Sequence, residues 1–180
     1  FNLLGPAIKG MHAIDLFAGT GALGNGRTGI TVFGSATNNT IGGTTGTTPG
    51  GPCTGACNVI SGNTFSGIGV ENAGTTGNVI QGNFIGTNAA GTAALGNAQL
   101  GIILDLAPSN TLIGGLVAGA GNVISGNAGQ GIQVTGTGNV VQGNFIGTNA
   151  AGTVALPNQS LGVRISGTGK KKLISSYDGS

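Results

Sequence analysis

Residues 58–63 read NVISGN, and the same six letters return at residues 122–127. A longer stretch, GNFIGTNAAGTAAL at residues 82–95, returns at residues 143–156 as GNFIGTNAAGTVAL. Recurrence of this kind in a chain of 180 residues indicates structural units that are repeated along the sequence. Such repeats decide the fold before any single residue is considered.

Further repeats lie between these two. NVIQGN at residues 78–83 returns at residues 139–144 with Val141 in place of Ile80, and Ile-Gly-Gly begins at both Ile41 and Ile113. A fourth pattern is Gly, then Ile or Val, then any residue, then a further apolar residue. Its apolar positions begin at Ile30, Ile68, Ile102, Ile132 and Val163, so the sequence separations are 68 − 30 = 38, 102 − 68 = 34, 132 − 102 = 30 and 163 − 132 = 31.

Each repeated element is short and alternates. In Ile132-Gln133-Val134 the two apolar side chains point to one side and Gln133 points to the other. Gly and Asn interrupt every element, so no helix can run through it. Short strands separated by turns at intervals of roughly 20 to 40 residues are typical of a β-solenoid. The sequence therefore predicts an all-β fold, a single-stranded parallel β-helix.

The alternation also predicts which side chains are buried. The inward residues are expected to be Ile60, Ile68, Val70, Ile80, Ile124, Ile132, Val134 and Val141. Asn residues beside the strands are expected to stack into ladders of side-chain amides. Val59, Val79, Val123 and Val140 are expected to face outward. If their strands share one sheet, they form an apolar ridge, which either a loop such as TNAAGT covers or a partner contacts.

The sequence alone leaves the rung length open. The separation between NVISGN and NVIQGN is 78 − 58 = 20 in one copy and 139 − 122 = 17 in the other, which suits a small coil. The Gly-Ile strands instead give a mean separation of (163 − 30)/4 = 33.25. Insertions such as TNAAGTAALGN that bulge from one corner would reconcile the two values.

Composition and charge exclude several classes of protein. The net charge is +2, and three of the six basic residues form one run, Lys170, Lys171 and Lys172, which is too little and too local for a nucleic-acid interface. No apolar run approaches the roughly 18 residues of a membrane span. The chain begins at Phe1, which we interpret as a mature or truncated piece of a longer protein. Cys53 and Cys57 are predicted to form a small disulfide rather than half of a metal site, since no second Cys pair exists.

The repeats NVISGN, NVIQGNFIGT, the Gly-Ile strands and NAAGTxALGN resemble those of bacterial secreted β-strand-repeat proteins of the pectin-lyase-like superfamily. The resemblance covers roughly residues 14–169 and implies a right-handed parallel β-helix. It implies no particular activity, because that superfamily contains lyases, hydrolases, esterases, adhesins and modules without known chemistry. We expect one β-helix repeat domain at 1–169, with a cap segment at 1–13 and repeats at 14–169, followed by a non-repeat tail at 170–180.

Glu71 and Asp105 are the candidate catalytic residues. Each directly follows a Gly-Ile strand, at a position that Phe33, Thr135 and Ser166 occupy in other copies. Stacked strands would place the two carboxylates about 5 Å apart, where they could share a proton or act as acid and nucleophile on a sugar. The alternative is a pair of solvated turn residues, and it is favoured.

Arg164 and Gln133 are the candidate binding residues, because both face outward on the Gly-Ile strands. Arg164 is expected two rungs from Asp105 and is no obvious partner for it. A hydrolase built on His12 and Asp15 is disfavoured, since no Gly-x-Ser-x-Gly elbow accompanies them.

These observations favour an extracellular module for surface attachment or for binding a polysaccharide, a cell-surface glycan or another partner. It is expected to be non-catalytic and to need neither cofactor nor metal. The alternatives are a polysaccharide lyase or hydrolase and, third, a water- or ice-ordering surface. An uncapped solenoid is also expected to self-associate end to end or laterally.

Overall fold

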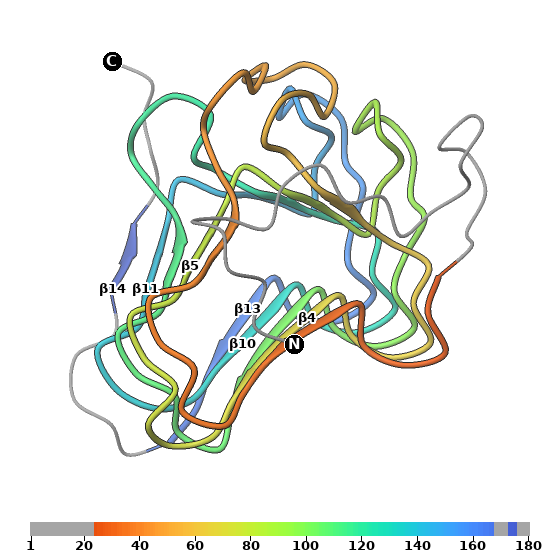
Figure 1. The fold of residues 1–180 in the computed structure, drawn as a ribbon. Helices are drawn as coiled ribbons and strands as arrows, with labels where there is room; N and C mark the ends of the chain where they lie inside the picture. The colour runs from red at the N-terminus through yellow and green to blue at the C-terminus, as the bar shows by residue number, and fades with distance from the viewer. Residues whose placement is uncertain (1–23, 168–172, 176–180) are drawn as a thin grey trace.

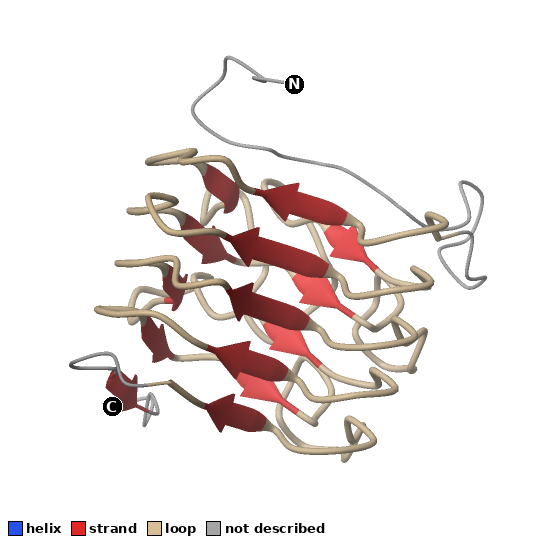
Figure 2. Cartoon of the chain, turned by 90° about the horizontal axis from the view of Figure 1, so that it is seen from below, coloured by secondary structure: helices blue, strands red, loops and turns tan. Residues whose placement is uncertain are grey.

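The computed structural model describes residues 24–167 and 173–175, and the fold is an all-β parallel solenoid. In those residues the chain forms fourteen short strands and no helix, and strands of successive rungs stack above one another (Figure 1, Figure 2). The expected fold class is therefore confirmed. The expected cap segment at 1–13, together with His12 and Asp15, lies outside the described residues.

Three parallel sheets wrap around one axis, and we name them A, B and C. Sheet C contains β1 (Ile30–Val32), β4 (Ile68–Glu71), β7 (Ile102–Asp105), β10 (Ile132–Val134) and β13 (Val163–Ile165). Sheet A contains β2 (Thr40–Gly42), β5 (Val79–Gln81), β8 (Leu112–Gly114), β11 (Val140–Gln142) and β14 (Leu173–Ser175). Sheet B contains β3 (Val59–Ile60), β6 (Phe84–Ile85), β9 (Val123–Ile124) and β12 (Phe145–Ile146). Each full rung thus supplies one strand to C, then A, then B.

The strand register settles the rung length. Ile30 is paired with Ile68, Ile68 with Ile102, Ile102 with Ile132, and Ile132 with Val163. Each separation between successive Gly-Ile strands is therefore one full rung, and the Gly-Ile spacing is the true period. The shorter separation, from NVISGN to NVIQGN, joins a sheet B strand to the sheet A strand of the next rung.

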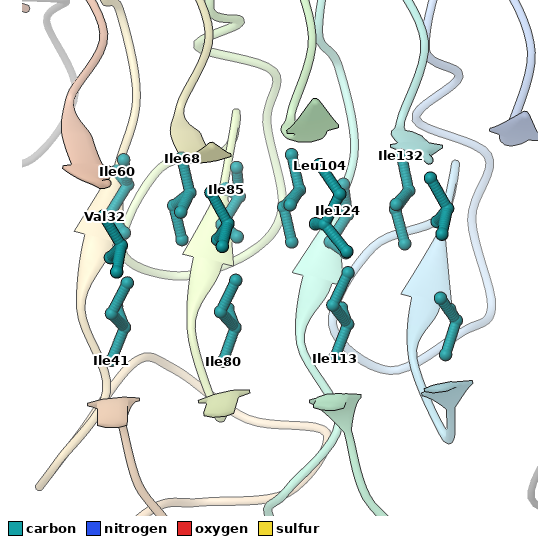
Figure 3. Packing of buried hydrophobic residues seen from close by; sticks show 14 residues of the cluster. Val32, Ile41, Ile60, Ile68, Ile80, Ile85, Leu104, Ile113, Ile124 and Ile132 are labelled. Carbon is teal, nitrogen blue, oxygen red and sulfur yellow. The ribbon is translucent and has the colours of Figure 1, made fainter. Parts of the chain in front are cut away.

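The core is a stack of aliphatic side chains from all three sheets, shown in Figure 3. Ile60, Ile80, Ile124 and Val141 are buried, as are Ile68, Val70, Ile132 and Val134. The expected inward positions are thus confirmed. β-Branched side chains suit such columns because each packs on its equivalent one strand away.

Asparagine ladders run along the corners of the solenoid. In the longest, Nδ2 of Asn63 donates to Oδ1 of Asn97 at 2.7 Å, and Asn97 donates in turn to Asn127 at 2.8 Å. The second amide hydrogen is also used, since Nδ2 of Asn97 donates to the carbonyl of Ile60 at 3.1 Å. Buried amides in this arrangement have their hydrogen bonds satisfied, which confirms the expected ladders.

The predicted valine ridge is wrong as a single surface. Val59 and Val123 lie in sheet B, whereas Val79 and Val140 lie in sheet A. The similarity of NVISGN and NVIQGN misled the prediction, because strands of both sheets use the same alternation. In sheet B the alternative of a covering loop is correct, since Ala89 of the TNAAGT loop packs against the buried cluster that contains Val59 and Val123.

Long loops alternate between two corners of the solenoid. In the first and third rungs they join sheet A to sheet B, at residues 43–58 and 115–122. In the second and fourth rungs they join sheet B to sheet C, at residues 86–101 and 147–162. Both kinds therefore flank sheet B, and they gather at the top of Figure 1. The sequence had placed the insertions at one corner only.

The C-terminal tail contributes to the solenoid. Its strand β14 pairs in parallel with β11, so that Val140 lies opposite Leu173 and Gln142 opposite Ser175. Lys170, Lys171 and Lys172 lie outside the described residues. Although its sequence departs from the repeats, this part of the tail continues sheet A.

Candidate functional site

The outer surface of sheet C brings together the residues that the sequence singles out. One outward column consists of Thr31, Gly69, Ile103, Gln133 and Arg164, which are neighbours in the strand register. A second set of residues stands at the equivalent position at the end of each strand: Glu71 and Asp105, which are register partners, and Phe33, Thr135 and Ser166, which directly follow their strands. Five adjacent strands at about 4.8 Å spacing make this surface roughly 19 Å long.

Glu71 and Asp105 are direct register partners on β4 and β7. Both are half-buried, and alternation along the strands places both on the outer side. Gly69 leaves room for the glutamate: a Cβ built on Gly69 would lie 2.9 Å from Oε1 of Glu71. The Glu71 carboxylate therefore folds back over its own strand instead of extending into solvent.

Gln133 and Arg164 are direct register partners in the other column. Gln133 is half-buried and Arg164 is exposed. β10 separates Arg164 from the strand of Asp105, so the two residues are two rungs apart, as the sequence had indicated. The face thus carries carboxylates in its centre and a guanidinium group toward its C-terminal end.

The turn that follows sheet C is unusual in the third rung, where both Leu106 and Ala107 have positive φ. Its first position has positive φ in every rung, and four rungs place Gly34, Asn72, Gly136 and Gly167 there. The third rung instead has Leu106, with φ of 57° and 59% of its surface exposed. A left-handed backbone costs a branched L-residue about 1–2 kcal/mol, yet an apolar side chain stands there beside Asp105.

The outer side of sheet B forms a second candidate site. Its outward column is Val59, Phe84, Val123 and Phe145, paired in that order. The long loops from both corners surround this column and leave a pocket of 170 Å³. Phe84, Val123 and Phe145 line the pocket on the side of sheet B, and Pro49 and Leu116 line it on the side of the loops.

The loop at residues 43–58 forms one wall of this pocket and is held by a disulfide and by hydrogen bonds. A disulfide joins Cys53 and Cys57, the backbone N–H of Cys53 donates to the carbonyl of Ala89 at 2.7 Å, and Cys57 is buried against the sheet B column. Thr48 and Thr54 share a hydrogen bond between hydroxyls at 2.7 Å. Such a loop holds its shape without a ligand.

Sequence reasoning missed this pocket. The signals were Leu116 and Val117, an apolar pair in a glycine-rich loop, both of which are exposed. The aromatic residues Phe84 and Phe145 were also visible within the repeats, but their sheet was not assigned. Among the described residues no group of three or more His, Cys, Asp or Glu could hold a metal ion.

No helix of the described chain could cross a membrane. Comparison of the sequence with protein-family models and with curated proteins, and of the structure with solved structures, found no significant match. Function is therefore inferred from the two surfaces themselves.

Proposed function

We propose that this chain is an extracellular, non-catalytic β-helix module that attaches to a surface by binding a glycan along the outer face of sheet C. The wider proposal is that it belongs with the bacterial secreted β-strand-repeat proteins of the pectin-lyase-like superfamily, which its repeats resemble. The observation that carries the binding role is Leu106, an exposed apolar residue at a position where the other rungs use Gly or Asn.

Leu106 supports a contact surface because its placement costs stability without a visible structural gain. An outlier of this kind is more often retained where it contacts a ligand than where it only folds the chain. Beside it the face offers carboxylates from Glu71 and Asp105, and two rungs earlier the ring of Phe33, which is 62% exposed.

A glycan matches this chemistry better than an apolar partner does. Sugar rings combine hydroxyl groups with apolar C–H faces, so they suit a surface on which hydrogen-bonding side chains alternate with exposed apolar ones. Gln133 and Arg164 add donors along the same face. A chain of sugars would run across the strands, parallel to the axis, where successive rungs repeat at a constant spacing.

The test is a glycan array with the full chain and two variants. Leu106→Gly should retain or raise stability, by up to about 1 kcal/mol, because the left-handed strain is removed. The same variant should lose binding on the array. Leu161→Ala, which alters an exposed leucine before β13 instead of after a sheet C strand, should bind as the parent does. Unchanged binding by Leu106→Gly would reject the proposed face.

A polysaccharide lyase or hydrolase is the second candidate, favoured by the pairing of Glu71 with Asp105. The two residues are register partners on adjacent strands, whose backbones lie about 4.8 Å apart, and a pair of neighbouring carboxylates can take acid and nucleophile roles on a glycoside. Polymer degradation is measured from new reducing ends or unsaturated products. Activity that disappears in Glu71→Gln and Asp105→Asn, with the β-structure retained, would replace the binding proposal by an enzymatic one.

The water- or ice-ordering surface has less support. Its requirement is a regular row of threonines, whereas the outward column of sheet C changes residue type at every strand, and Thr31 is its one threonine. We therefore do not propose this function for the chain.

A further inference from the structure

We propose that the pocket on the outer side of sheet B binds a small, neutral, apolar molecule of about six to eight carbon atoms. This site is separate from the sheet C face and does not depend on the proposed glycan binding. The inference rests on the shape of the pocket, its lining and the hydrogen bonds of its polar groups.

The recess arises from an alternation of side-chain size. Val123 lies between Phe84 and Phe145 in the strand register, so a small side chain is flanked by two aromatic rings. Each ring is covered on its other side by a glycine of its own rung's loop: a Cβ built on Gly91 would lie 2.7 Å from Cε2 of Phe84. These contacts restrain the rings, and Val123, which is itself buried, lines the pocket between them.

Two loops enclose that space from the other corner. Loop 43–58 comes from the first rung and loop 115–122 from the third, and they meet where Gly119 packs against Thr47. Pro49, Pro52 and the disulfide belong to one wall, and Leu116 and Val117 to the other. Leu116 and Val117 are more than half exposed, at 53% and 67%, although they line a pocket. A ligand there would cover part of both side chains.

The polar groups at the rim are already engaged. The Thr47 hydroxyl donates to the carbonyl of Thr44 at 2.9 Å, and the Thr54 hydroxyl donates to the carbonyl of Gly46 at 2.9 Å. No charged side chain is among the residues that line the pocket. A charged ligand would lose its hydration there without gaining an ionic partner, which is strongly unfavourable.

The volume of the pocket suits a ligand of this size. An apolar cavity of about 150 Å³ in a protein stays dry and accepts benzene, and this pocket measures 170 Å³. A monocyclic aromatic ring with a short substituent, or an aliphatic chain of similar size, therefore fits.

The experiment is a titration of the full chain with toluene. Binding is monitored by NMR through the chemical shifts of the methyl groups of Val123, Leu116 and Val117. We expect saturable shifts confined to this group. Benzoate, which has the same ring with a charge, should bind at least about tenfold more weakly. Absence of saturable toluene shifts, or equal affinity for benzoate, would overturn the proposal.

Val123→Phe gives the sharpest variant, because the neighbouring rungs already hold Phe84 and Phe145 at the equivalent position. The new ring should fill the recess and reduce toluene affinity by about tenfold or more. Val140→Phe makes the same change on sheet A, away from the pocket, and should leave affinity unchanged. Undiminished binding by Val123→Phe would place the ligand elsewhere and reject the site.

A second variant covers the case in which Val123→Phe does not fold. Leu116→Ala removes an exposed side chain from the wall, where no core packing is lost. It should fold as the parent does and bind toluene several-fold more weakly. Full affinity in this variant would again contradict the proposal.

Discussion

Replacing Thr111 by Asn should stabilise the solenoid. The ladder at the corner before sheet A runs through Asn39, Asn78, Thr111 and Asn139, which directly precede paired strands. Thr111 interrupts it. Its side chain is fully buried, and among the described residues its hydroxyl has no hydrogen-bond partner.

The intact part of this corner shows what an asparagine would restore. Asn39 donates both its backbone N–H and its side-chain amide to Oδ1 of Asn78, each at 2.9 Å. At position 111 the backbone N–H still donates to Oδ1 of Asn139 at 2.8 Å, but no amide accompanies it. With Asn at this position, Asn78 gains a ladder acceptor and Asn139 receives a second donor.

The magnitude follows from these bonds. Two added side-chain hydrogen bonds contribute about 0.5–1.5 kcal/mol each, and removing an unpaired buried hydroxyl contributes in the same direction. A net gain of about 1–3 kcal/mol is expected from these contributions. In a chain of this size that corresponds to a rise in Tm of about 2–4 °C for each kcal/mol.

Denaturant unfolding followed by circular dichroism measures the effect. Thr111→Val is the matched control, since it removes the hydroxyl without supplying an amide. It should be near neutral or slightly stabilising, and clearly below Thr111→Asn. If Thr111→Asn is no more stable than Thr111→Val, the ladder adds nothing beyond the cost of the buried hydroxyl, and the prediction is refuted.

Three further predictions concern other parts of the molecule. Ile124→Ala should lower the free energy of unfolding by about 2–5 kcal/mol through lost burial plus a cavity, and a loss below half that range in denaturant unfolding would contradict the core assignment of Ile124. Replacing Cys53 and Cys57 by Ser should cost about 2 kcal/mol or less, because the disulfide closes a short loop. The same pair of changes should weaken toluene binding by loosening a pocket wall, and unchanged affinity in the titration would show that the wall needs no cross-link. The double variant Glu71→Gln with Asp105→Asn should unfold within about 0.5 kcal/mol of the parent, and a larger destabilisation would show that the carboxylates hold the turn.

The sequence predicted the fold because its signals were local and repeated. The Gly-Ile pattern from Ile30 to Val163 indicated the register of sheet C without any knowledge of the other sheets, although the sequence alone left the rung length open. Inward and outward faces followed from alternation within short strands. Glu71 and Asp105 were correctly expected one rung apart for the same reason.

The assignment of strands to sheets A and B was not predictable in this way. NVISGN and NVIQGN look alike because strands of both sheets carry Val outward, Ile inward and Asn at the corners. The structure pairs Val59 with Phe84 and Ile41 with Ile80, so NVISGN is equivalent to the strand in GNFIGT, and NVIQGN to Thr-Ile-Gly-Gly. Residues with little sequence likeness are thus equivalent in space, and similar ones are not.

This difference between likeness in sequence and equivalence in space also explains how the pocket forms from ordinary repeat residues. The two copies of NVISGN are separated by 122 − 58 = 64, which equals the separation of 132 − 68 = 64 across two rungs from Ile68 to Ile132. Each motif therefore returns in every second rung, and neighbouring rungs are always of different kinds. Inside the solenoid the difference vanishes, because Ile60, Ile85 and Ile124 stack as equivalents.

On the outer surface of the solenoid, the side chains and the loop lengths both alternate from one rung to the next. Val stands next to Phe in the outward column of sheet B, and a long loop at one corner stands next to a short one. A pocket that Val123 lines, walled by loops from the first and third rungs, follows from that alternation. The repeat that gives a uniform core thus also gives a non-uniform outer surface, and binding sites are expected where the two kinds of rung meet.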